Sequence, residues 1–455
     1  MDRGVIMKKY QVIVIGAGPA GGACASACVK SGLKVAMIED YGFGGTCPLR
    51  GCNPKKILTG AAEIVAQAEG LNEKGIISLP KINWQKLAAF RDSFVQGKKD
   101  KIKSAYSNLG IDTYLEHAEF IDKNIIKAGP HHLESDFFVL ATGIRPASLN
   151  IPGEELISSS DDFLALSRLP ESVCFIGGGF ISFEFASIAV RAGSKVSIVH
   201  RSQRVLKQFD SDLTHKLVQA LQHAGVDVHL NSPLQSISRE GNTCLIMAGE
   251  KDNPLTIKAD MVVHGAGRVP NVDSLNLDKP GVKFNGQGVE VNKFMQSVSN
   301  PNVFAVGDVA DTPYALTPTG DMEGRIAASN IINPGSSEVR YRGVPKVVYT
   351  APALCSVGIL EEEAEKKNIP HKIIDNNDIS EWFSWKHTGQ KFAGCKIIID
   401  EEKDIIVGAH ILGSGAEELA NMFAMAINLE LPVSRLKEVL WAYPTKGYYF
   451  KYMLE

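Results

Sequence analysis

One pattern of hydrophobic and polar positions occurs twice in this sequence: an apolar run, a glycine-rich turn, a helix-length segment and a second apolar run. In the first copy the runs are residues 11–16 (QVIVIG) and 35–39 (VAMIE), and the helix is expected from about Pro19 to Lys30. Short apolar runs bounded by glycine are typical of strands buried in a parallel sheet. This copy therefore predicts a βαβ unit with a nucleotide-type turn.

The second copy starts at residues 173–179 (VCFIGGG), continues through a helix to about Ala192 and returns as a strand at residues 195–200. Residues 262–271 form a strand and turn that close it. Residues 302–310 predict a strand that delivers Asp308 to a loop at its carboxyl end.

The Gly/Pro-punctuated exit from the strand in residues 138–153 predicts a domain boundary near Ile151. From about Tyr341 apolar strands alternate with two helices, near Glu361 and Glu417, which predicts a separate α+β domain. The expected domains are residues 1–150, 151–271, 272–340 and 341–455.

Composition agrees with several cooperating domains, since 455 residues exceed the roughly 100 to 200 of one domain. The net charge of -3 gives no electrostatic reason to expect nucleic acid or an anionic membrane as partner. Eight cysteines are too sparse for a disulfide-stapled secreted scaffold. The first ten residues lack a leader pattern, and no apolar run approaches the roughly 20 residues of a membrane helix. We expect a cytoplasmic protein.

Gly16, Gly18 and Gly21 form a GxGxxG turn after the first strand, where backbone N–H groups can approach a pyrophosphate. An acid 18 residues after Gly21, Glu39, is placed to bond an adenosine ribose. The alternative is a glycine turn that only packs the helix on the sheet.

Cys47 and Cys52 lie five positions apart, just before a helix that Pro54 can start. A regular helix would separate them by roughly 7.5 Å along its axis, beyond the usual Cα separation of about 4.4 to 6.8 Å in a disulfide. The turn must therefore be distorted, which Gly51 permits. A bridge over so short a loop suits opening and closing better than stapling. A nearby helix N-terminus and Arg50 predict lowered thiol pKa values; two buried structural cysteines are the alternative.

The other six cysteines are expected to be small core residues. His131 and His132 have no neighbouring ligand pattern and are expected in a solvated loop, and no spacing resembles a metal site.

With two nucleotide modules and the C-x4-C box in order, the chain resembles the pyridine nucleotide-disulfide oxidoreductases, which include glutathione reductase, dihydrolipoamide dehydrogenase and mercuric reductase. The resemblance covers nearly the whole chain and rests on GGTCPLRGCNPKK, LATGIRP, AVGDVA, LTPTGDMEGR and the C-terminal VPKVVYTAPALCSVG and VGAHILGSGAEEL. It implies two Rossmann-like dinucleotide-binding domains, a C-terminal α+β dimerisation domain, bound FAD and a homodimer.

The resemblance also implies roles. Cys47 would be the interchange thiol that meets substrate, and Cys52 the thiol beside the flavin that forms a charge-transfer complex. Lys55 and Glu184 would pair near the flavin N5, and Asp308 would bind the ribityl or pyrophosphate region. The remaining FAD contacts implied by the matched segments are Gly45, Thr46, Thr142 and Gly143.

The second nucleotide turn begins with Gly177 and Gly179, but Ser182 replaces the last glycine, so its helix is expected slightly farther from the strand. In place of the acid of an NAD site, the next strand ends in His200, followed by Arg201, Arg204 and Lys207. These cations favour the 2'-phosphate of NADPH, and Arg201 and Lys207 resemble the phosphate-binding pair of glutathione reductase; a solvated basic face is the alternative. Two further residues complete the expected nicotinamide nucleotide site: Phe180, where the family often has a mobile tyrosine, and Gly267.

One segment departs from the family. Where glutathione reductase has a His-Pro-Thr followed by Glu, this chain reads AYPTKGYYFKYM, so Tyr443 replaces the histidine and Tyr448 the glutamate. A phenol with a pKa near 10 is a poor proton shuttle at neutral pH, and such shuttling contributes about 10² to 10⁴-fold in rate. A mercuric reductase would also need a C-terminal cysteine pair, whereas this chain ends KYMLE.

The first hypothesis is a cytoplasmic FAD enzyme that passes electrons from NADPH through Cys47 and Cys52 to a small-molecule or protein disulfide. In this hypothesis Tyr443 is at the site as a hydrogen-bond donor or a substrate contact. The second is an NADPH-dependent flavoenzyme that reduces quinones, metal ions or oxygen, and the third is a flavin-bound redox sensor.

Overall fold

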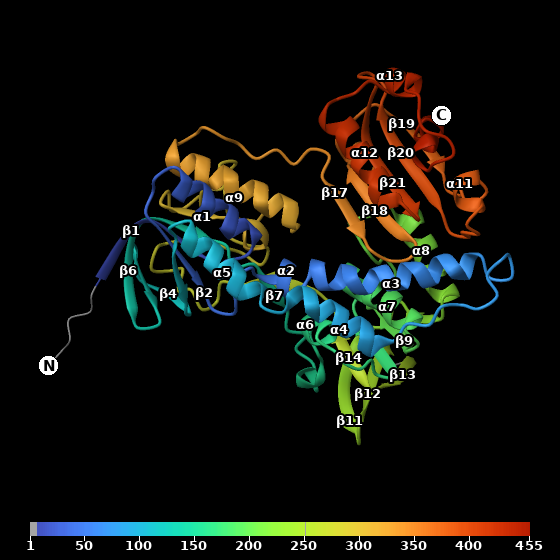
Figure 1. Cartoon of the computed structure of the whole chain (residues 1–455), viewed down its shortest axis with the longest axis horizontal. Coiled ribbons are helices and arrows are strands. Elements are labelled where there is room, and N and C mark those ends of the chain that lie inside the picture. The colour runs from blue at the N-terminus through green and yellow to red at the C-terminus, as the bar shows by residue number, and fades with distance from the viewer. Residues whose placement is uncertain (1–6, 251) are drawn as a thin grey trace. The chain divides into compact units, whose positions relative to one another are not determined.

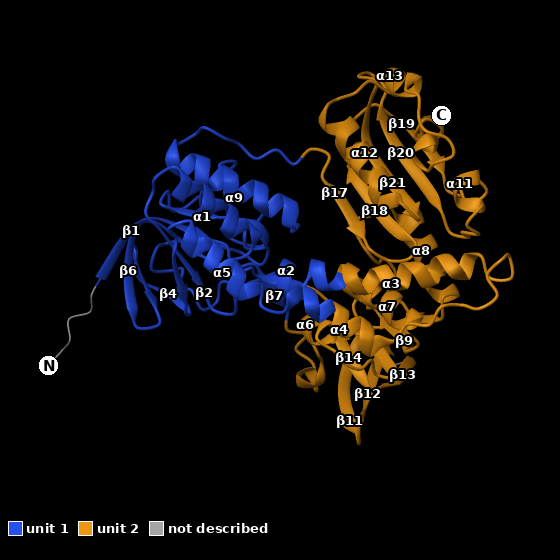
Figure 2. Ribbon diagram, in the orientation of Figure 1, with its two compact units in different colours: residues 1–55, 91–147, 268–341 blue, residues 56–90, 148–267, 342–455 orange. Residues whose placement is uncertain are grey.

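The computed structural model describes residues 7–250 and 252–455. The chain divides into two compact units, which are described separately (Figure 2). Each unit combines three segments distant in sequence: residues 1–55, 91–147 and 268–341 form unit 1, and residues 56–90, 148–267 and 342–455 form unit 2. The expected absence of a leader rests partly on residues 1–6, which lie outside the described residues.

Unit 1 is built on a seven-stranded sheet in the order β3-β2-β1-β6-β5-β4, with β16 paired to the other side of β6. Its strands are β1 (Met7–Ile15), β2 (Val35–Glu39), β3 (Asp112–Leu115), β4 (Ala118–Asp122), β5 (Ile125–Ala128), β6 (His131–Leu140) and β16 (Val303–Ala305). A short antiparallel pair adds β7 (Ile144–Pro146) and β15 (Arg268–Pro270). β1 runs parallel to β2 and β6, so the carboxyl ends of all three strands meet at one edge. That edge is where a dinucleotide binds in such sheets.

Two helices of unit 1 pack closely because small residues face one another. They are α1 (Pro19–Lys30) and α9 (Thr317–Ile332), which lie side by side (Figure 1). A Cβ on Gly324 would lie 2.2 Å from the carbonyl oxygen of Ala20, so only glycine fits there. The remaining helices that begin in unit 1 are α2 (Thr46–Arg50), α3 (Cys52–Gly70), α5 (Lys98–Asn108) and the 3-10 turn η2 (Gly307–Val309).

Unit 2 contains a parallel four-stranded sheet in the order β10-β9-β8-β14. Its strands are β8 (Ser172–Ile176), β9 (Lys195–Val199), β10 (Val226–His229) and β14 (Met261–His264). The helical elements around it are η1 (Glu154–Leu156), α4 (Trp84–Val95, which continues into unit 1), α6 (Ser160–Leu164), α7 (Phe180–Arg191) and α8 (Ser211–His223). An antiparallel three-stranded sheet joins β11 (Leu234–Glu240), β12 (Thr243–Glu250) and β13 (Asn253–Ala259).

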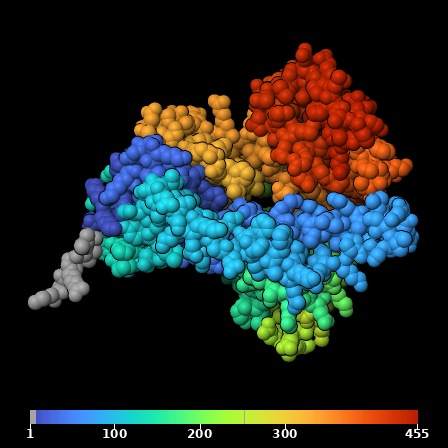
Figure 3. All heavy atoms as spheres, in the orientation of Figure 1, coloured from blue at the N-terminus to red at the C-terminus, as the bar shows by residue number. Residues whose placement is uncertain are grey.

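The C-terminal part of unit 2 is an antiparallel sheet in the order β17-β18-β21-β20-β19, and its atoms are coloured orange to red (Figure 3). Its strands are β17 (Pro345–Val348), β18 (Ala353–Gly358), β19 (His371–Asn376), β20 (Gly394–Asp400) and β21 (Ile405–Gly413). α12 (Ala416–Asn428) packs its apolar stripe, which includes Leu419 and Phe423, into the core of this sheet. The other helical elements are α10 (Glu361–Lys366), α11 (Phe383–Lys386), α13 (Val433–Glu438), η3 (Gly447–Phe450) and η4 (Tyr452–Leu454).

The predicted α/β fold class is confirmed, with both βαβ units and a C-terminal α+β domain present. The helix predicted from Pro19 to Lys30 has those bounds in the structure. The two C-terminal helices predicted near Glu361 and Glu417 are present as α10 and α12, and the short helices α11 and α13 form in addition. Among the described residues, no helix has the length and apolar character needed to cross a membrane. The predicted domain boundaries stay predictions.

Candidate active site

A single cleft in unit 1 gathers most of the residues predicted to hold FAD. It lies at the carboxyl ends of β1, β2 and β6 and is also lined by the start of α9. The predicted residues that line it are Gly16, Gly18, Glu39, Gly45, Thr46, Cys47, Thr142, Gly143 and Asp308. Their roles stay predictions, but the fold places them around one space.

The glycine-rich turn leaves no room for side chains. Gly16 has φ +107°, and a Cβ there would lie 2.2 Å from the carbonyl oxygen of Ala141. A Cβ on Gly21 would lie 2.1 Å from the carbonyl oxygen of Gly16, so Gly21 lets α1 approach β1. Gly45 has φ +66°, and a Cβ there would lie 2.6 Å from the Cα of Gly18. The backbone of this turn is therefore open to a pyrophosphate.

Glu39 organises the loop that follows β2. Its Oε2 accepts a hydrogen bond from the Ala17 N–H at 2.8 Å, and its Oε1 accepts from the Tyr41 and Gly42 N–H groups at 3.0 and 3.2 Å. A carboxylate accepts about four hydrogen bonds, so capacity remains for a ribose hydroxyl. Glu39 thus holds the glycine turn and is also placed to bind a ligand.

The cleft carries an unused polar group that fits a bound dinucleotide. The Oγ1 of Thr142 is buried and finds no hydrogen-bond partner within the described part of the chain. Buried hydroxyls are normally hydrogen-bonded, so a ligand oxygen would complete this group. Asp308 sits on η2 beside it, and burial raises the pKa of its carboxyl while Arg268 opposes the rise. These residues fit FAD.

Sequence reasoning did not single out Glu323, which holds the Asp308 turn in place. Glu323 lies on α9 with no exposed surface, accepts from the Gly307 N–H at 2.7 Å and accepts from the Tyr341 hydroxyl at 2.6 Å. Burial raises the pKa of its carboxyl, against these hydrogen bonds. The segment LTPTGDMEGR contains it, but the contact with Gly307 is visible only in three dimensions.

The cysteine pair sits where two helices meet at a sharp break. Cys47 belongs to α2 and lines the cleft, whereas Cys52 is the first residue of α3 and is exposed. Gly51 breaks the helix with φ -140° and ψ -117°, as the predicted distortion requires. The Cys52 Sγ lies 3.8 Å from the Oγ1 of Thr317 at the start of α9. The two sulfurs are thiols that share a hydrogen bond.

The expectation of a lowered pKa was wrong for Cys47. The hydrogen bond with Cys52 raises the pKa of the Cys47 thiol, and burial adds to this, while Thr317 and Lys98 act in the opposite direction. Two thiols that share a proton do not ionise together, so one sulfur retains its hydrogen when the other becomes a thiolate. Lys98 supplies a positive charge that acts on Cys47.

The second nucleotide turn, in unit 2, repeats the constraints of the first. Gly177 has φ +112°, and a Cβ there would lie 2.3 Å from the Gly265 carbonyl oxygen. Gly179 caps α7, and Phe180 follows as its half-exposed first residue. Ser182 is fully buried, and a Cβ on Gly265 would lie 2.1 Å from its Oγ, so Gly265 makes room for the serine that replaces the third glycine.

Cations surround the end of β9. Arg201 and Lys207 are both exposed, and both act electrostatically on the imidazole of His200. Burial, chiefly, lowers the pKa of His200, while these two charges lower it further and a hydrogen bond with Arg204 opposes them. Arg201 and Lys207 therefore both bring positive charge near the position where an NAD site carries an acid. Gly267 follows β14 with φ +119°.

Glu184 and Lys55 were predicted to pair near the flavin. Glu184 is buried on α7 and accepts from the Tyr349 N–H at 2.8 Å. Its pairing with Lys55 stays a prediction.

The tyrosines that replace the family's histidine and glutamate form an aromatic group in which Tyr443 is exposed and Tyr448 is partly buried. Tyr443 is 63% exposed and packs on the ring of Tyr448 with centroids 4.8 Å apart. The Tyr448 hydroxyl lies 3.2 Å from that of Tyr452, and this contact, with the charge of Lys451, lowers the pKa of Tyr448. The departure from the family is thus a surface cluster of phenols.

Two dinucleotide-binding folds with a dithiol in the first cleft define a flavoprotein oxidoreductase that works with a pyridine nucleotide. Comparison with known families agrees: residues 10–324 match the pyridine nucleotide-disulphide oxidoreductase model, and residues 344–453 match the dimerisation domain of the same enzymes. The chain belongs to the pyridine nucleotide-disulphide oxidoreductase family. Members of this family bind FAD and a pyridine nucleotide.

Its relatives span several activities. A dihydrolipoyl dehydrogenase of Buchnera aphidicola is 31% identical over 96% of this chain and 93% of its own length. A glutathione reductase of Nostoc sp. is 29% identical over 92% and 94%, and a mercuric reductase of Staphylococcus aureus 28% over 96% and 80%. A solved structure of the HOCl-induced flavoprotein disulfide reductase RclA from Escherichia coli, in a Cu(II) complex, is 25% identical with a TM-score of 0.86, covering 98% of this chain and 99% of that one.

Proposed function

We propose that the protein is an NADPH-dependent FAD disulfide oxidoreductase that acts as a cytoplasmic homodimer. The observation that carries the proposal is the placement of Cys47 in the same cleft as the glycine turn, hydrogen-bonded to Cys52. The dimerisation domain supports the homodimer, and the sparse cysteines suit a reducing compartment.

In the proposed reaction, two electrons from NADPH reduce a Cys47–Cys52 disulfide to two thiols. FAD, when bound, supplies the two-electron relay between the nucleotide and the sulfurs. The Cys47 thiolate then attacks a substrate sulfur and releases one thiol, and Cys52 attacks the mixed disulfide and releases the second. The shared hydrogen bond raises the pKa of the Cys47 thiol, so Cys47 becomes the attacking thiolate only when Cys52 takes the shared proton.

The proposed residues divide the work of binding. Gly16, Gly18 and Glu39 would hold the adenosine half of FAD, and Thr142 and Asp308 would contact its ribityl and pyrophosphate region. In unit 2, Gly177 and Gly179 would receive the pyrophosphate of the nicotinamide nucleotide.

NADPH is proposed over NADH because Arg201 and Lys207 lie around His200, at the end of β9, where an NAD site carries an acid. Their replacement by alanine should raise the KM for NADPH and leave the KM for NADH nearly unchanged. Steady-state kinetics with both nucleotides tests this.

Anaerobic stopped-flow absorbance with NADPH tests the role of the cysteines. Cys47→Ser should remove disulfide turnover and change the long-wavelength absorbance of the reduced enzyme, because no second sulfur is left to re-form the bridge. Cys24→Ala is the matched control, since Cys24 is a buried thiol of α1. Unchanged turnover in Cys47→Ser would remove the pair from the mechanism.

The two phenols favour a second candidate function. Tyr443 and Tyr448 stand in place of an imidazole and a carboxylate. This favours an electron acceptor whose reduction does not require protonation of a departing thiolate, such as a quinone, a metal ion or oxygen. The metal ions screened should include Cu(II), because a structure of RclA is a Cu(II) complex. Full NADPH oxidation with one of these acceptors and none with a disulfide panel would favour this function. No NADPH oxidation with any acceptor would instead indicate a sensor.

A further inference from the structure

The loop between β9 and α8 carries the proposed 2'-phosphate cations, and the C-terminal domain holds it at three points. Lys346 of β17 donates to the Gln208 carbonyl oxygen at 2.7 Å. Lys396 of β20 pairs with Asp210 at 3.1 Å. Glu362 of α10 pairs with Arg204 at 2.6 Å. The loop proposed to select the nucleotide is therefore positioned by side chains of two strands and one helix that are far away in sequence.

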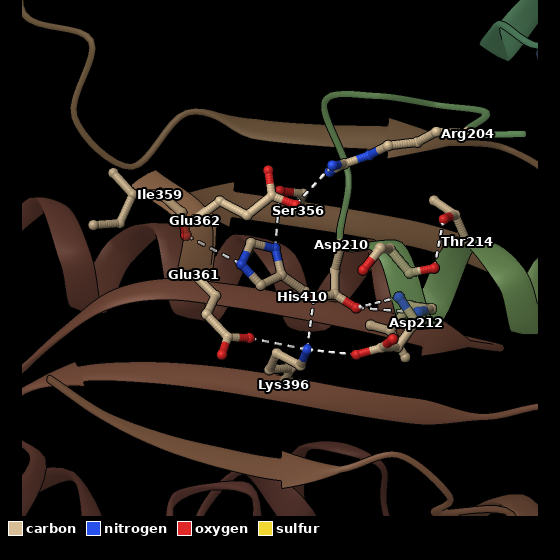
Figure 4. Close-up of polar contacts among 12 residues, drawn as sticks. Arg204, Asp210, Asp212, Thr214, Ser356, Ile359, Glu361, Glu362, Lys396 and His410 are labelled. Carbon is tan, nitrogen blue, oxygen red and sulfur yellow. Dashed lines mark hydrogen bonds and ion pairs between the residues drawn. The ribbon is translucent and has the colours of Figure 1, made fainter. Parts of the chain in front are cut away.

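Lys396 is the fixed centre of this arrangement. Its side chain is only 6% exposed, and its ammonium contacts the carboxylates of Asp210, Asp212 and Glu361 at 3.1, 2.7 and 3.2 Å (Figure 4). Asp210 also caps α8, because its other oxygen accepts from the Asp212 and Leu213 N–H groups at 3.1 Å. A buried lysine with three acids leaves the end of the loop little freedom to move.

Arg204 is the loop cation that pairs with the C-terminal domain, through Glu362. Its Nη1 lies 2.6 Å from the Oε1 of Glu362, and Figure 4 shows the guanidinium reaching across from the loop toward α10. Its Nε is buried and has no hydrogen-bond acceptor within residues 7–250 and 252–455. Arg201 and Lys207 are exposed and act on His200. The charge of Arg204 is therefore neutralised by Glu362, while Arg201 and Lys207 bring positive charge near His200.

We propose that Glu362 is a specificity-determining residue that withholds Arg204 from the 2'-phosphate of the bound nucleotide. The inference rests on the proposed NADPH site, and it deepens that proposal by assigning a residue of the C-terminal domain to nucleotide selection. A carboxylate beside the loop weakens the binding of a phosphate dianion in two ways. It neutralises one guanidinium, and its own negative charge repels the phosphate. The protein therefore prefers NADPH less strongly than the composition of its loop would give.

Glu362→Gln in the holoenzyme tests the inference by releasing Arg204 without changing the size of the side chain. The probes are 2'-phospho-ADP-ribose and ADP-ribose, which need neither the flavin nor the cysteines, and the measurement is isothermal titration calorimetry. Because a partly exposed ion pair contributes little, the Kd for 2'-phospho-ADP-ribose should fall about two- to fivefold, with the Kd for ADP-ribose unchanged. The ratio of the two Kd values is a readout that a merely structural role would not move.

Two variants serve as controls. Glu365→Gln removes an exposed acid from the same helix without touching Arg204, and should change neither Kd. In the double variant Arg204→Ala/Glu362→Gln the fall in the Kd for 2'-phospho-ADP-ribose should disappear, because no guanidinium is left to be released.

The outcomes separate the inference from the proposed function. A wild-type protein that binds both probes equally would overturn the NADPH preference, while a new preference in Glu362→Gln would still support the role of Glu362. A wild-type preference that Glu362→Gln leaves unchanged, or equal weakening of both probes, would overturn the inference alone.

Discussion

Acidification is expected to weaken the C-terminal sheet through one histidine. His410 on β21 is fully buried, with Nδ1 3.0 Å from the Ser356 hydroxyl and Nε2 3.1 Å from the Ile359 carbonyl oxygen. Because a carbonyl only accepts, Nε2 carries the hydrogen, and Nδ1 accepts from the serine. The neutral ring therefore has both nitrogens satisfied, and a proton added at low pH would be a buried charge.

The size of the effect follows from the pKa. Burial lowers the pKa of His410 to about 4, with Asp210 acting in the opposite direction. Since this lies below the unfolded value of about 6.5, the contribution to stability is fully present above pH 6.5 and is lost as the pH falls toward 4. At about 1.4 kcal/mol per pKa unit, the maximum loss is about 3 kcal/mol, and about 2 kcal/mol is lost at pH 5.

Hydrogen–deuterium exchange with mass spectrometry measures this locally. Peptides that cover β18 and β21 should show an opening free energy lower by about 2 kcal/mol at pH 5 than at pH 7.5, after correction for chemical exchange. His410→Gln should be less stable at both values and should lack this fall, because glutamine does not titrate.

Peptides of β6 and β16 serve as the internal control. Burial raises the pKa of Asp308 and Glu323 in that unit, so acidification there restores rather than removes stability. Equal opening free energies at the two pH values in the wild-type C-terminal sheet would refute the reasoning, as would a full fall in His410→Gln.

Three further predictions concern the glycine turn, the buried lysine and the phenols. Gly16→Ala should cost about 2 to 4 kcal/mol and release flavin, measured as flavin absorbance per protein, whereas Gly32→Ala, at φ +86° with open space around it, should cost about 1 kcal/mol and keep it. Lys396→Met should lower the free energy of unfolding by about 2 to 4 kcal/mol in urea, because it leaves Asp210 buried without its cation, whereas Lys258→Met, which breaks an exposed pair with Glu240, should cost less than about 1 kcal/mol. If the substrate is a disulfide, Tyr443→His/Tyr448→Glu should raise kcat about tenfold or more at neutral pH, and an unchanged kcat would show that protonation of the leaving thiolate does not limit turnover.

Local patterns were enough to predict the nucleotide modules. The turn at Gly16 and the helix that begins at Pro19 are specified by neighbours in sequence, because backbone geometry and buried-strand periodicity act over a few residues. The break at Gly51 was predicted for the same reason.

Contacts between distant residues could not be predicted in this way. The hydrogen bond from the Gly307 N–H to Glu323 and the ion pair of Arg204 with Glu362 depend on the packing of separate elements. The pKa of Cys47 was misjudged because the helix N-terminus and the charge of Arg50 were weighed without the shared hydrogen bond to Cys52. Electrostatic environments of this kind are properties of the tertiary structure.

The division of unit 1 into three segments has a consequence for synthesis on the ribosome. β6 pairs with β16, and α1 packs against α9, so the first 147 residues lack neighbours that are made only after residue 267. At about 5 to 20 residues per second, the nascent first segment waits on the order of ten seconds or more before β16 and α9 can join it. During that interval residues 138–140 of β6, which pair with β16 in the finished sheet, form an unpaired strand edge, which makes the growing chain a candidate for binding by a co-translational chaperone.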